Sequence, residues 1–109
     1  MYVIPSAVIR LVNGNSAYEG RVEVFIDGAW GTVCDDGFGR KDAEVACRQL
    51  GFQGVVTFRS RAFFGHGTGL IHLDEVACVG NEITLASCSR GSPDCIHWED
   101  VGIVCASSG

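Results

Sequence analysis

The chain has 109 residues, a formal net charge of −5, a hydrophobic fraction of 47% and 19% charged residues. This composition excludes a disordered chain and predicts one domain with a core of its own. The acidic balance argues against general binding of nucleic acids or anionic membranes through the whole surface, and no segment is apolar for long enough to span a membrane.

The first half of the chain predicts an antiparallel hairpin that is preceded by a short strand. Residues 8–12 form an apolar strand, which a turn at Asn13-Gly14-Asn15 ends. Residues 20–26 begin with strict alternation of polar and apolar side chains, and Asp27-Gly28 is a hairpin turn into a strand over 29–33.

A helix is predicted over residues 40–51. Ala43, Ala46, Cys47 and Leu50 recur at helical spacing, and Gly51 suits the C-terminal cap. The rest of the chain predicts a β-rich stretch over 55–61, a glycine loop over 65–69, a strand over 70–76, a short helix over 82–88 and a buried final strand over 101–105.

The six cysteines place the protein outside the cell. No two of them are spaced as C-x-x-C, which argues for three disulfides rather than a structural metal site. Cys95 and His97 could supply half of a zinc site, and this is the less favoured alternative. Spacing alone does not choose among the possible disulfide pairings.

Six separate motifs in the chain resemble the scavenger receptor cysteine-rich (SRCR) domain, and together they extend over residues 8–105. The two extra cysteines of the eight-cysteine group are replaced by Tyr18 and Phe52, so the chain is similar to the six-cysteine group A. The motifs are Arg10-Leu-Val-Asn-Gly, Glu19-Gly-Arg-Val-Glu-Val, Trp30-Gly-Thr-Val-Cys-Asp-Asp, Asp42-Ala-Glu-Val-Ala-Cys-Arg-Gln-Leu-Gly, Leu73-Asp-Glu-Val-Ala-Cys-Val-Gly-Asn-Glu and Cys95-Ile-His-Trp-Glu-Asp-Val-Gly-Ile-Val-Cys.

The resemblance implies a small disulfide-rich α+β domain, in which a curved antiparallel sheet cradles one main helix and a short second helix is added. The resemblance extends over a single domain at 8–105. Because the chain is expected to be oxidised and its N-terminus does not read as a signal peptide, we expect it to come from a larger secreted or membrane-anchored parent, with residues 1–7 and 106–109 as flanking or linker remnants. Carried over motif by motif, the resemblance implies disulfides that join Cys34 to Cys95, Cys47 to Cys105 and Cys78 to Cys88.

The resemblance also implies cation sites built from acidic side chains. Asp35 and Asp36 follow Cys34 directly and Glu99 lies just after Cys95, so the implied disulfide brings the three carboxylates together. Carboxylate oxygens suit Ca²⁺. Family members bind Ca²⁺ at the equivalents of Asp35, Asp36 and Glu99, and some have a second site that matches Asp74, Asn81 and Glu82. The alternative for both clusters is a solvated acidic face with nearby arginines.

Basic side chains predict a ligand-binding surface beside the acidic cluster. Such a surface would suit sulfated or sialylated glycans, lipopolysaccharide or an extracellular protein of mixed charge. The alternative is scattered solubilising charges. A bacteria-binding stretch of the family corresponds to residues 20–34, but Asp27 replaces its arginine. The candidate ligand-binding residues are Arg40, Lys41, Arg48, Arg59 and Arg61.

The sequence predicts no enzyme activity for this domain. His66, His72 and His97 could each serve as a base, but no nucleophile motif accompanies them. The predicted function is therefore a non-catalytic extracellular recognition module, of the scavenger receptor type and associated with innate immunity, that binds polyanionic, microbial-surface or protein ligands with the help of Ca²⁺. The alternative is a structural or targeting accessory domain of a larger secreted enzyme, such as a protease or an oxidase.

Overall fold

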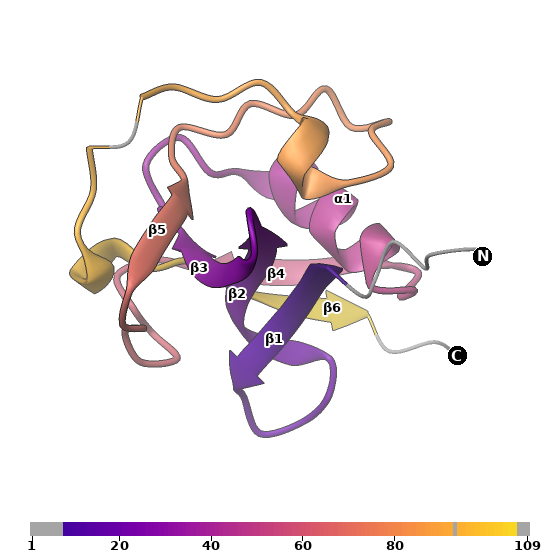
Figure 1. Ribbon diagram of the computed structural model, residues 1–109. Helices are drawn as coiled ribbons and strands as arrows, with labels where there is room; N and C mark the ends of the chain where they lie inside the picture. The colour runs from indigo at the N-terminus through magenta and orange to yellow at the C-terminus, as the bar shows by residue number, and fades with distance from the viewer. Residues whose placement is uncertain (1–7, 93, 107–109) are drawn as a thin grey trace.

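The computed structural model describes residues 8–92 and 94–106, which form a six-stranded sheet with one α-helix (Figure 1). The strand order is β4-β6-β2-β3-β5, and β1 also pairs with β2. The elements are β1 (Ile9–Asn13), β2 (Glu19–Ile26), β3 (Ala29–Val33), α1 (Arg40–Gln49), β4 (Gly54–Arg59), β5 (Leu70–Leu73), the 3₁₀ turns η2 (Leu85–Ser87) and η3 (His97–Glu99), and β6 (Gly102–Ala106).

The sheet is organised around β2, which pairs antiparallel with β1 over residues 20–24, with β6 over 19–21 and with β3 over 23–26. Asp27 and Gly28 both have positive φ, 53° and 83°, as the predicted two-residue hairpin turn between β2 and β3 requires. The alternation along β2 turns Val22 and Val24 into the core, with 0% and 2% exposure.

The helix α1 covers one side of β4 and β6 (Figure 1). Its buried face includes Ala43, Ala46 and Cys47, as the helical spacing predicts. Its C-terminus is closed by a Schellman motif at Gly51, whose φ is 96°: the Gly51 N–H donates to the Arg48 carbonyl, and the next N–H, from Phe52, donates to the Cys47 carbonyl.

Buried Asp42 fixes the other end of α1. Its Oδ2 accepts the Gly39 N–H at 2.7 Å, and its Oδ1 accepts the Cys78 N–H at 2.7 Å. One carboxylate therefore completes the first turn of the helix and also holds the start of the short disulfide loop against it.

Several predicted elements differ from the structure in length or direction. The β3–β5 pair is parallel rather than antiparallel, which the long crossover over residues 34–69 permits. The strand predicted over 70–76 ends at Leu73, before Glu75 takes a positive φ of 52°. Ala106, predicted as a remnant, is the last residue of β6 and pairs with Gly54. Residues 1–7 and 107–109 lie outside the described residues.

The short helix predicted over 82–88 is only the single 3₁₀ turn η2. The Cys78–Cys88 disulfide holds its two Cα atoms 4.8 Å apart, so the intervening chain must reverse within ten residues. That leaves no length for a regular helix.

Three disulfides connect the elements, in the pairing that the resemblance implies: Cys34–Cys95, Cys47–Cys105 and Cys78–Cys88. Cys47 lies on α1 and Cys105 on β6, so this bridge runs through the core between helix and sheet. Within the described part of the chain, no helix has the length and apolar character needed to cross a membrane.

Candidate functional site

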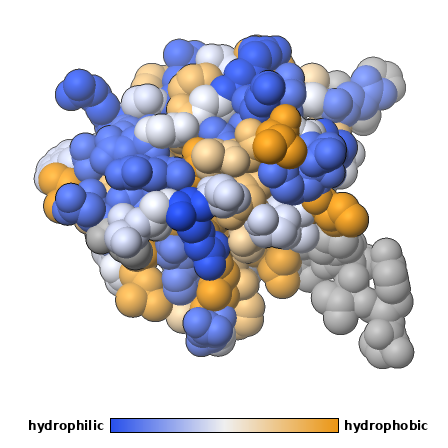
Figure 2. All heavy atoms as spheres, turned by 90° about the horizontal axis from the view of Figure 1, so that it is seen from above, coloured by the Kyte–Doolittle hydropathy of each residue, from blue (hydrophilic) through white to orange (hydrophobic). Residues whose placement is uncertain are grey.

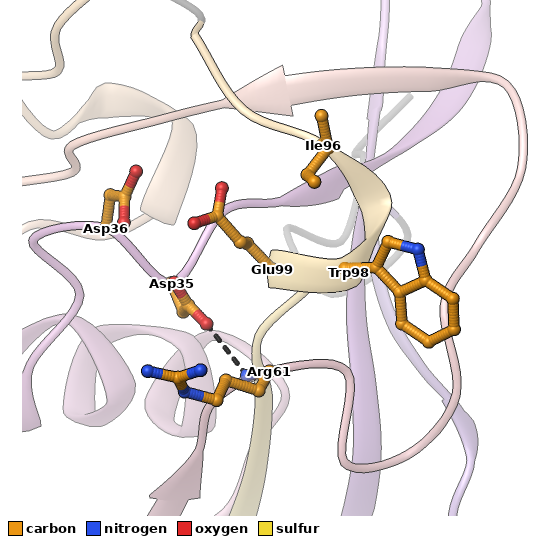
Figure 3. A pocket seen from close by; sticks show the side chains of 6 residues that line it. All are labelled: Asp35, Asp36, Arg61, Ile96, Trp98 and Glu99. Atoms are coloured by element: carbon orange, nitrogen blue, oxygen red, sulfur yellow. Dashed lines mark hydrogen bonds between the residues drawn. The ribbon is translucent and has the colours of Figure 1, made fainter.

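The end of β3 and the turn η3 together build an acidic pocket. The Asp35 N–H donates to the Glu99 carbonyl at 2.7 Å, and the Cys34–Cys95 disulfide joins the two segments beside it. The pocket has a volume of about 450 Å³. Figure 3 shows the three carboxylates grouped on one side, with the Trp98 ring turned away from them. The lining side chains are those of Asp35, Asp36, Arg61, Ile96, Trp98 and Glu99, and we call this the acidic pocket.

Asp36 and Glu99 are the two carboxylates that come within metal-binding distance. One oxygen of each lies within 4.8 Å of the other, in a group with the sulfurs of Cys34 and Cys95. The sulfurs are bonded to each other and are not available as thiolate ligands. Within residues 8–92 and 94–106, neither carboxylate has an ion pair with a basic side chain.

Asp35 lines the same pocket but is also used elsewhere. Its Oδ2 accepts the backbone N–H of Arg61 at 2.8 Å (Figure 3). Arg61 and Ala62 both have positive φ, 58° and 53°, a backbone conformation that is costly for side-chain-bearing residues. The Ala62 N–H donates to the Asp100 carbonyl at 3.0 Å. Two hydrogen bonds that the turn donates to the acidic segments therefore hold it in this strained conformation.

This donor set fits a hard cation such as Ca²⁺. Two oxygens that bind one Ca²⁺ at ~2.3–2.6 Å can lie up to about 5 Å apart, and the Asp36–Glu99 separation falls within that limit. Asp35 keeps Oδ1 for a ligand while Oδ2 holds Arg61. Asp36 and Glu99 can therefore contribute oxygens to one cation site, whereas Asp35 lines the pocket outside the group that comes within 4.8 Å.

In the second predicted cation site, Asp74 and Glu82 already accept hydrogen bonds from the backbone. Asp74 is 1% exposed, and its Oδ2 accepts the Asp94 N–H at 2.7 Å, while Oδ1 is buried without a partner among the described residues. The carboxylate of Glu82 accepts the N–H groups of Val79 and Gly80, and these hydrogen bonds lower the pKa of Glu82. Asn81 is exposed on the same turn.

The five basic candidates differ in their contacts. Of the five, only Arg61 lines the acidic pocket in the described structure. Arg40 donates to the carbonyls of Val55 and Val56, and Arg48 donates to those of Gly80 and Glu82, so both join α1 to neighbouring segments. Lys41 is exposed on the helix. Arg59 lies with its guanidinium 4.9 Å from the centre of the Phe63 ring.

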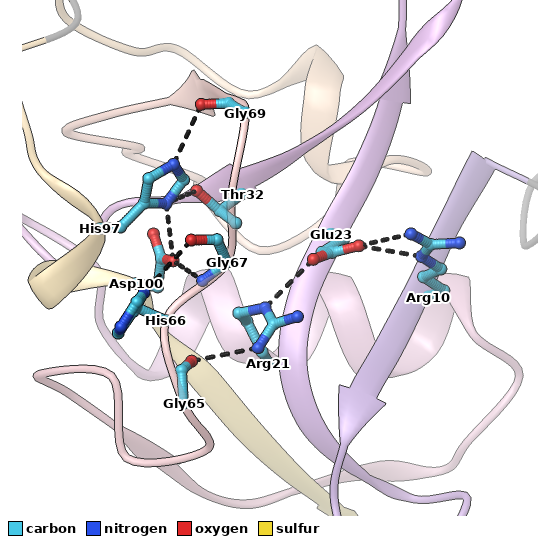
Figure 4. Close-up of polar contacts among 10 residues, drawn as sticks. All are labelled: Arg10, Arg21, Glu23, Thr32, Gly65, His66, Gly67, Gly69, His97 and Asp100. Carbon is cyan, nitrogen blue, oxygen red and sulfur yellow. Dashed lines mark hydrogen bonds and ion pairs between the residues drawn. The ribbon is translucent and has the colours of Figure 1, made fainter.

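A polar cluster behind the acidic pocket was not anticipated from the sequence (Figure 4). His97 Nδ1 lies 2.9 Å from Asp100 Oδ2, and His97 Nε2 lies 3.0 Å from the Gly69 carbonyl. Burial alone would lower the pKa of His97, but the Gly69 carbonyl and the Asp100 carboxylate together outweigh it and raise the pKa above 6.5. Asp100 Oδ2 also accepts the Gly67 N–H at 2.7 Å, which anchors the glycine loop.

A second chain of charges, exposed at Arg10 and buried at Arg21 and Glu23, crosses the same face of the sheet (Figure 4). Glu23 accepts from Arg10 on β1 at 2.7 Å and from Arg21, two residues away on β2, at 3.0 Å. Arg21 also donates to the Gly65 carbonyl at 3.2 Å. The alternation in the sequence places Arg21 and Glu23 on the same face of β2 and so indicates this pair. Their partners on other segments depend on the strand register, which the sequence does not show.

The histidines have structural contacts. His72 Nε2 lies 2.9 Å from the Ala29 carbonyl, and the His66 ring lies 4.8 Å from that of Trp98. Together with the contacts of His97, these show that each of the three candidate bases has a partner within the described fold.

Comparisons with known proteins agree with this architecture. A model of the scavenger receptor cysteine-rich domain matches residues 12–106. The chain is 52% identical over 100 residues to a scavenger receptor cysteine-rich domain superfamily protein of Patiria pectinifera, and 46% identical over 106 residues to the macrophage scavenger receptor types I and II of Mus musculus. These matches cover 89% and 94% of the chain but only 9% and 23% of the two relatives.

The same agreement holds for a solved structure. The third SRCR domain of murine neurotrypsin superposes with a TM-score of 0.83 at 52% identity, and the match covers 89% of this chain and 94% of that domain. The sequence match, the three disulfides and the shared fold show that the chain belongs to the scavenger receptor cysteine-rich domain family.

Proposed function

We propose that this domain is a non-catalytic, extracellular recognition module that binds anionic ligands through Ca²⁺ held in the acidic pocket. One observation carries the proposal. Asp36 and Glu99 place carboxylate oxygens within 4.8 Å of each other, with no ion pair to either among the described residues. Two carboxylates this close repel each other, and a bound cation would remove the repulsion.

The geometry of the pocket supports an anionic partner. Ca²⁺ takes six to eight oxygen ligands, more than Asp35, Asp36 and Glu99 supply in this open pocket, so positions remain for a ligand's sulfate, carboxylate or phosphate. Arg61 lines the same pocket and can pair with a further anionic group. Sulfated or sialylated glycans, lipopolysaccharide and acidic segments of extracellular proteins all offer such groups.

A second Ca²⁺ near Asp74, Asn81 and Glu82 is a further part of the proposal. Asp74 Oδ1 supports it, because this buried oxygen accepts no hydrogen bond from the described residues and such an oxygen is costly. The two N–H groups that Glu82 already accepts limit its contribution, so we expect weaker binding here than in the acidic pocket.

The setting outside the cell is supported by the three disulfides, since such bonds persist in oxidising compartments. Six cysteines in three bridges also support assignment to the six-cysteine group A. Extracellular sites with millimolar Ca²⁺ affinity are filled in that compartment, so even a weak site would be occupied. The relation to a murine macrophage scavenger receptor supports ligand recognition as the role, including one in innate immunity.

The metal is tested by thermal melting. Ca²⁺ binds only the folded chain, so the melting temperature should rise with millimolar Ca²⁺ and return to its starting value with chelator. Asp36→Ala should abolish the rise. Glu44→Gln is the matched control, because it removes one carboxylate from α1, away from the pocket, and should leave the rise intact.

The ligand is tested with dextran sulfate and, as its uncharged counterpart, dextran. Dextran sulfate should bind in Ca²⁺, bind less as salt rises, and be lost in chelator or in Asp36→Ala. Arg61→Ala should weaken binding without changing the melting shift. A Ca²⁺-dependent melting shift with no polyanion binding would instead favour a structural or targeting role within a larger secreted enzyme.

A further inference from the structure

The segment from Arg59 to Phe64 separates two pockets. Arg61 lines the acidic pocket, whereas Arg59 and Phe63 line a second pocket of about 580 Å³, within the usual range for small-ligand sites. Asn13, Asn15 and Glu19, from the β1–β2 connection, form the facing wall, and Phe64 completes the lining used below. We call this the second pocket.

The aromatic side of the second pocket is fixed without any ligand. The Arg59 guanidinium stacks over the Phe63 ring at 4.9 Å, and the Phe63 and Phe64 ring centres lie 5.0 Å apart, edge to face. The Phe64 ring in turn lies against the backbone of Gly102, where an added Cβ would come within 2.3 Å of it. Phe63 remains 61% exposed, so this supported ring presents an open apolar surface. Pre-organisation of this kind lowers the entropic cost of binding.

The facing wall offers polar groups with spare hydrogen-bonding capacity. Glu19 Oε2 accepts the Asn15 N–H at 3.0 Å, and its other oxygen accepts no hydrogen bond from the described residues. The side chains of Asn13 and Asn15 are exposed, and a carboxamide both donates and accepts. Arg59 adds donors that no carboxylate within residues 8–92 and 94–106 occupies.

This combination favours one ligand chemistry over others. Arg59 and Glu19 carry opposite charges, so an anionic ligand meets a carboxylate and a cationic ligand meets a guanidinium. A peptide anchored by an apolar side chain is favoured by a mostly apolar pocket or groove, yet four of the seven lining residues here are polar. On the upper face of the molecule, which is the face that Figure 2 shows, hydrophilic and hydrophobic side chains are also interleaved. Hydroxyl groups that donate and accept, next to an apolar C–H face, match the second pocket best.

We propose that the second pocket binds a neutral saccharide unit, with a C–H face of the sugar on Phe63 and its hydroxyl groups hydrogen-bonded to Asn13, Asn15, Glu19 and Arg59. This site is separate from the acidic pocket and needs no metal. A domain with both sites can bind an anionic group and a neutral sugar on either side of the same short segment.

The test is a titration of ¹⁵N-labelled domain with the methyl glycosides of glucose, galactose, mannose and N-acetylglucosamine. At least one glycoside should shift the amide resonances of residues 13–19 and 59–64 saturably, with a Kd on the order of millimolar, as expected for a small ligand in one open pocket. The Kd should be unchanged between Ca²⁺ and chelator and should change little with salt, since no net charge is involved.

Variants locate the binding. Phe63→Ala and Asn15→Ala alter exposed side chains and should each weaken binding by about fivefold or more at an unchanged melting temperature. Phe25→Ala is the matched control, because Phe25 is an exposed aromatic on β2 that does not line the second pocket. It should leave the Kd within about twofold.

The proposal is overturned if no glycoside shifts these amides, if the shifts map to the acidic pocket, or if Phe63→Ala binds as tightly as the parent chain. Binding that disappears in chelator would also overturn it, whether or not the acidic pocket holds Ca²⁺. If only a peptide or only a charged sugar produces the shifts, the assignment of a neutral saccharide is wrong.

Discussion

The backbone N–H of Arg61 donates a hydrogen bond to Oδ2 of Asp35 at 2.8 Å, which ties the acidic pocket to the strained turn at Arg61 and Ala62. A cation that binds to Asp35 would therefore share this carboxylate with the hydrogen bond that holds the segment between the two pockets. Occupancy of the pocket and the conformation of this segment should be linked for that reason.

Asp35→Ala and Asp35→Asn should separate these two roles. The alanine variant loses the acceptor for Arg61, so the Arg61 amide should exchange faster with solvent and the free energy of unfolding should fall by about 1 kcal/mol. The asparagine variant keeps a carbonyl acceptor and should preserve the protection, but it removes a negative charge and should weaken the Ca²⁺-induced rise in melting temperature. Hydrogen exchange followed by NMR measures the first effect. Equal protection in both variants would contradict the role of this hydrogen bond.

Stability should decrease as the pH rises through the pKa of His97. Because the folded-state pKa of His97 is raised above 6.5, the protonated ring stabilises the fold fully below the unfolded-state pKa, and this contribution is lost as the pH rises through the higher folded-state value. Melting temperature between about pH 6 and pH 8, measured in chelator to exclude the cation, should fall for the parent chain. His97→Gln should flatten that slope, and an unchanged slope would show that another group is responsible.

Gly102 should not tolerate a side chain. An added Cβ would lie 2.3 Å from Phe64 Cδ2 and 2.9 Å from the Gly20 carbonyl oxygen, so Gly102→Ala should lower the free energy of unfolding by about 1–3 kcal/mol. Gly54→Ala is the matched control on β4, because an added Cβ there meets nothing within 4 Å and its φ is not positive. Urea unfolding of both variants tests the contrast, which equal midpoints would refute.

The two kinds of disulfide should differ in their contribution to stability. Cys47–Cys105 closes a loop with a sequence separation of 58, whereas Cys78–Cys88 closes one of 10. In the chain-entropy model, removal by paired Cys→Ala substitutions should cost about 4 and about 3 kcal/mol respectively. Chemical unfolding gives the comparison. Peptide mapping of the parent chain should find these bridges, and two or more reactive thiols before reduction would contradict the extracellular setting.

The elements in which apolar side chains recur at a regular spacing were predictable from the sequence. The alternation at Val22 and Val24 gave β2, and the spacing of Ala43, Ala46 and Cys47 gave α1. The direction of β5 was not predictable, because four residues of Leu70–Leu73 carry no signal for a parallel rather than an antiparallel partner.

The site was predictable only in part. The approach of Asp36 to Glu99 followed from the disulfide pairing that the family resemblance implies, since spacing alone does not select that pairing. Arg59 and Arg61 line different pockets because the chain turns at Arg61 and Ala62 with positive φ. Neither residue type favours that conformation, so the sequence does not predict the turn. The contacts of His97 depend on a glycine loop that returns from a distant part of the chain.

The long disulfides determine what a protease could do to this domain outside the cell. The stretch between residues 60 and 69 is largely exposed, and it carries Arg61 and Phe63 between the two pockets. Cleavage there would leave Cys34 and Cys47 on one fragment and Cys95 and Cys105 on the other, so two covalent bonds would still join the halves. On non-reducing analysis a nicked molecule would still run as one species, with the added mass of one water, and it would keep the acidic pocket's carboxylates. The turn at Arg61 would nevertheless have lost its continuous chain.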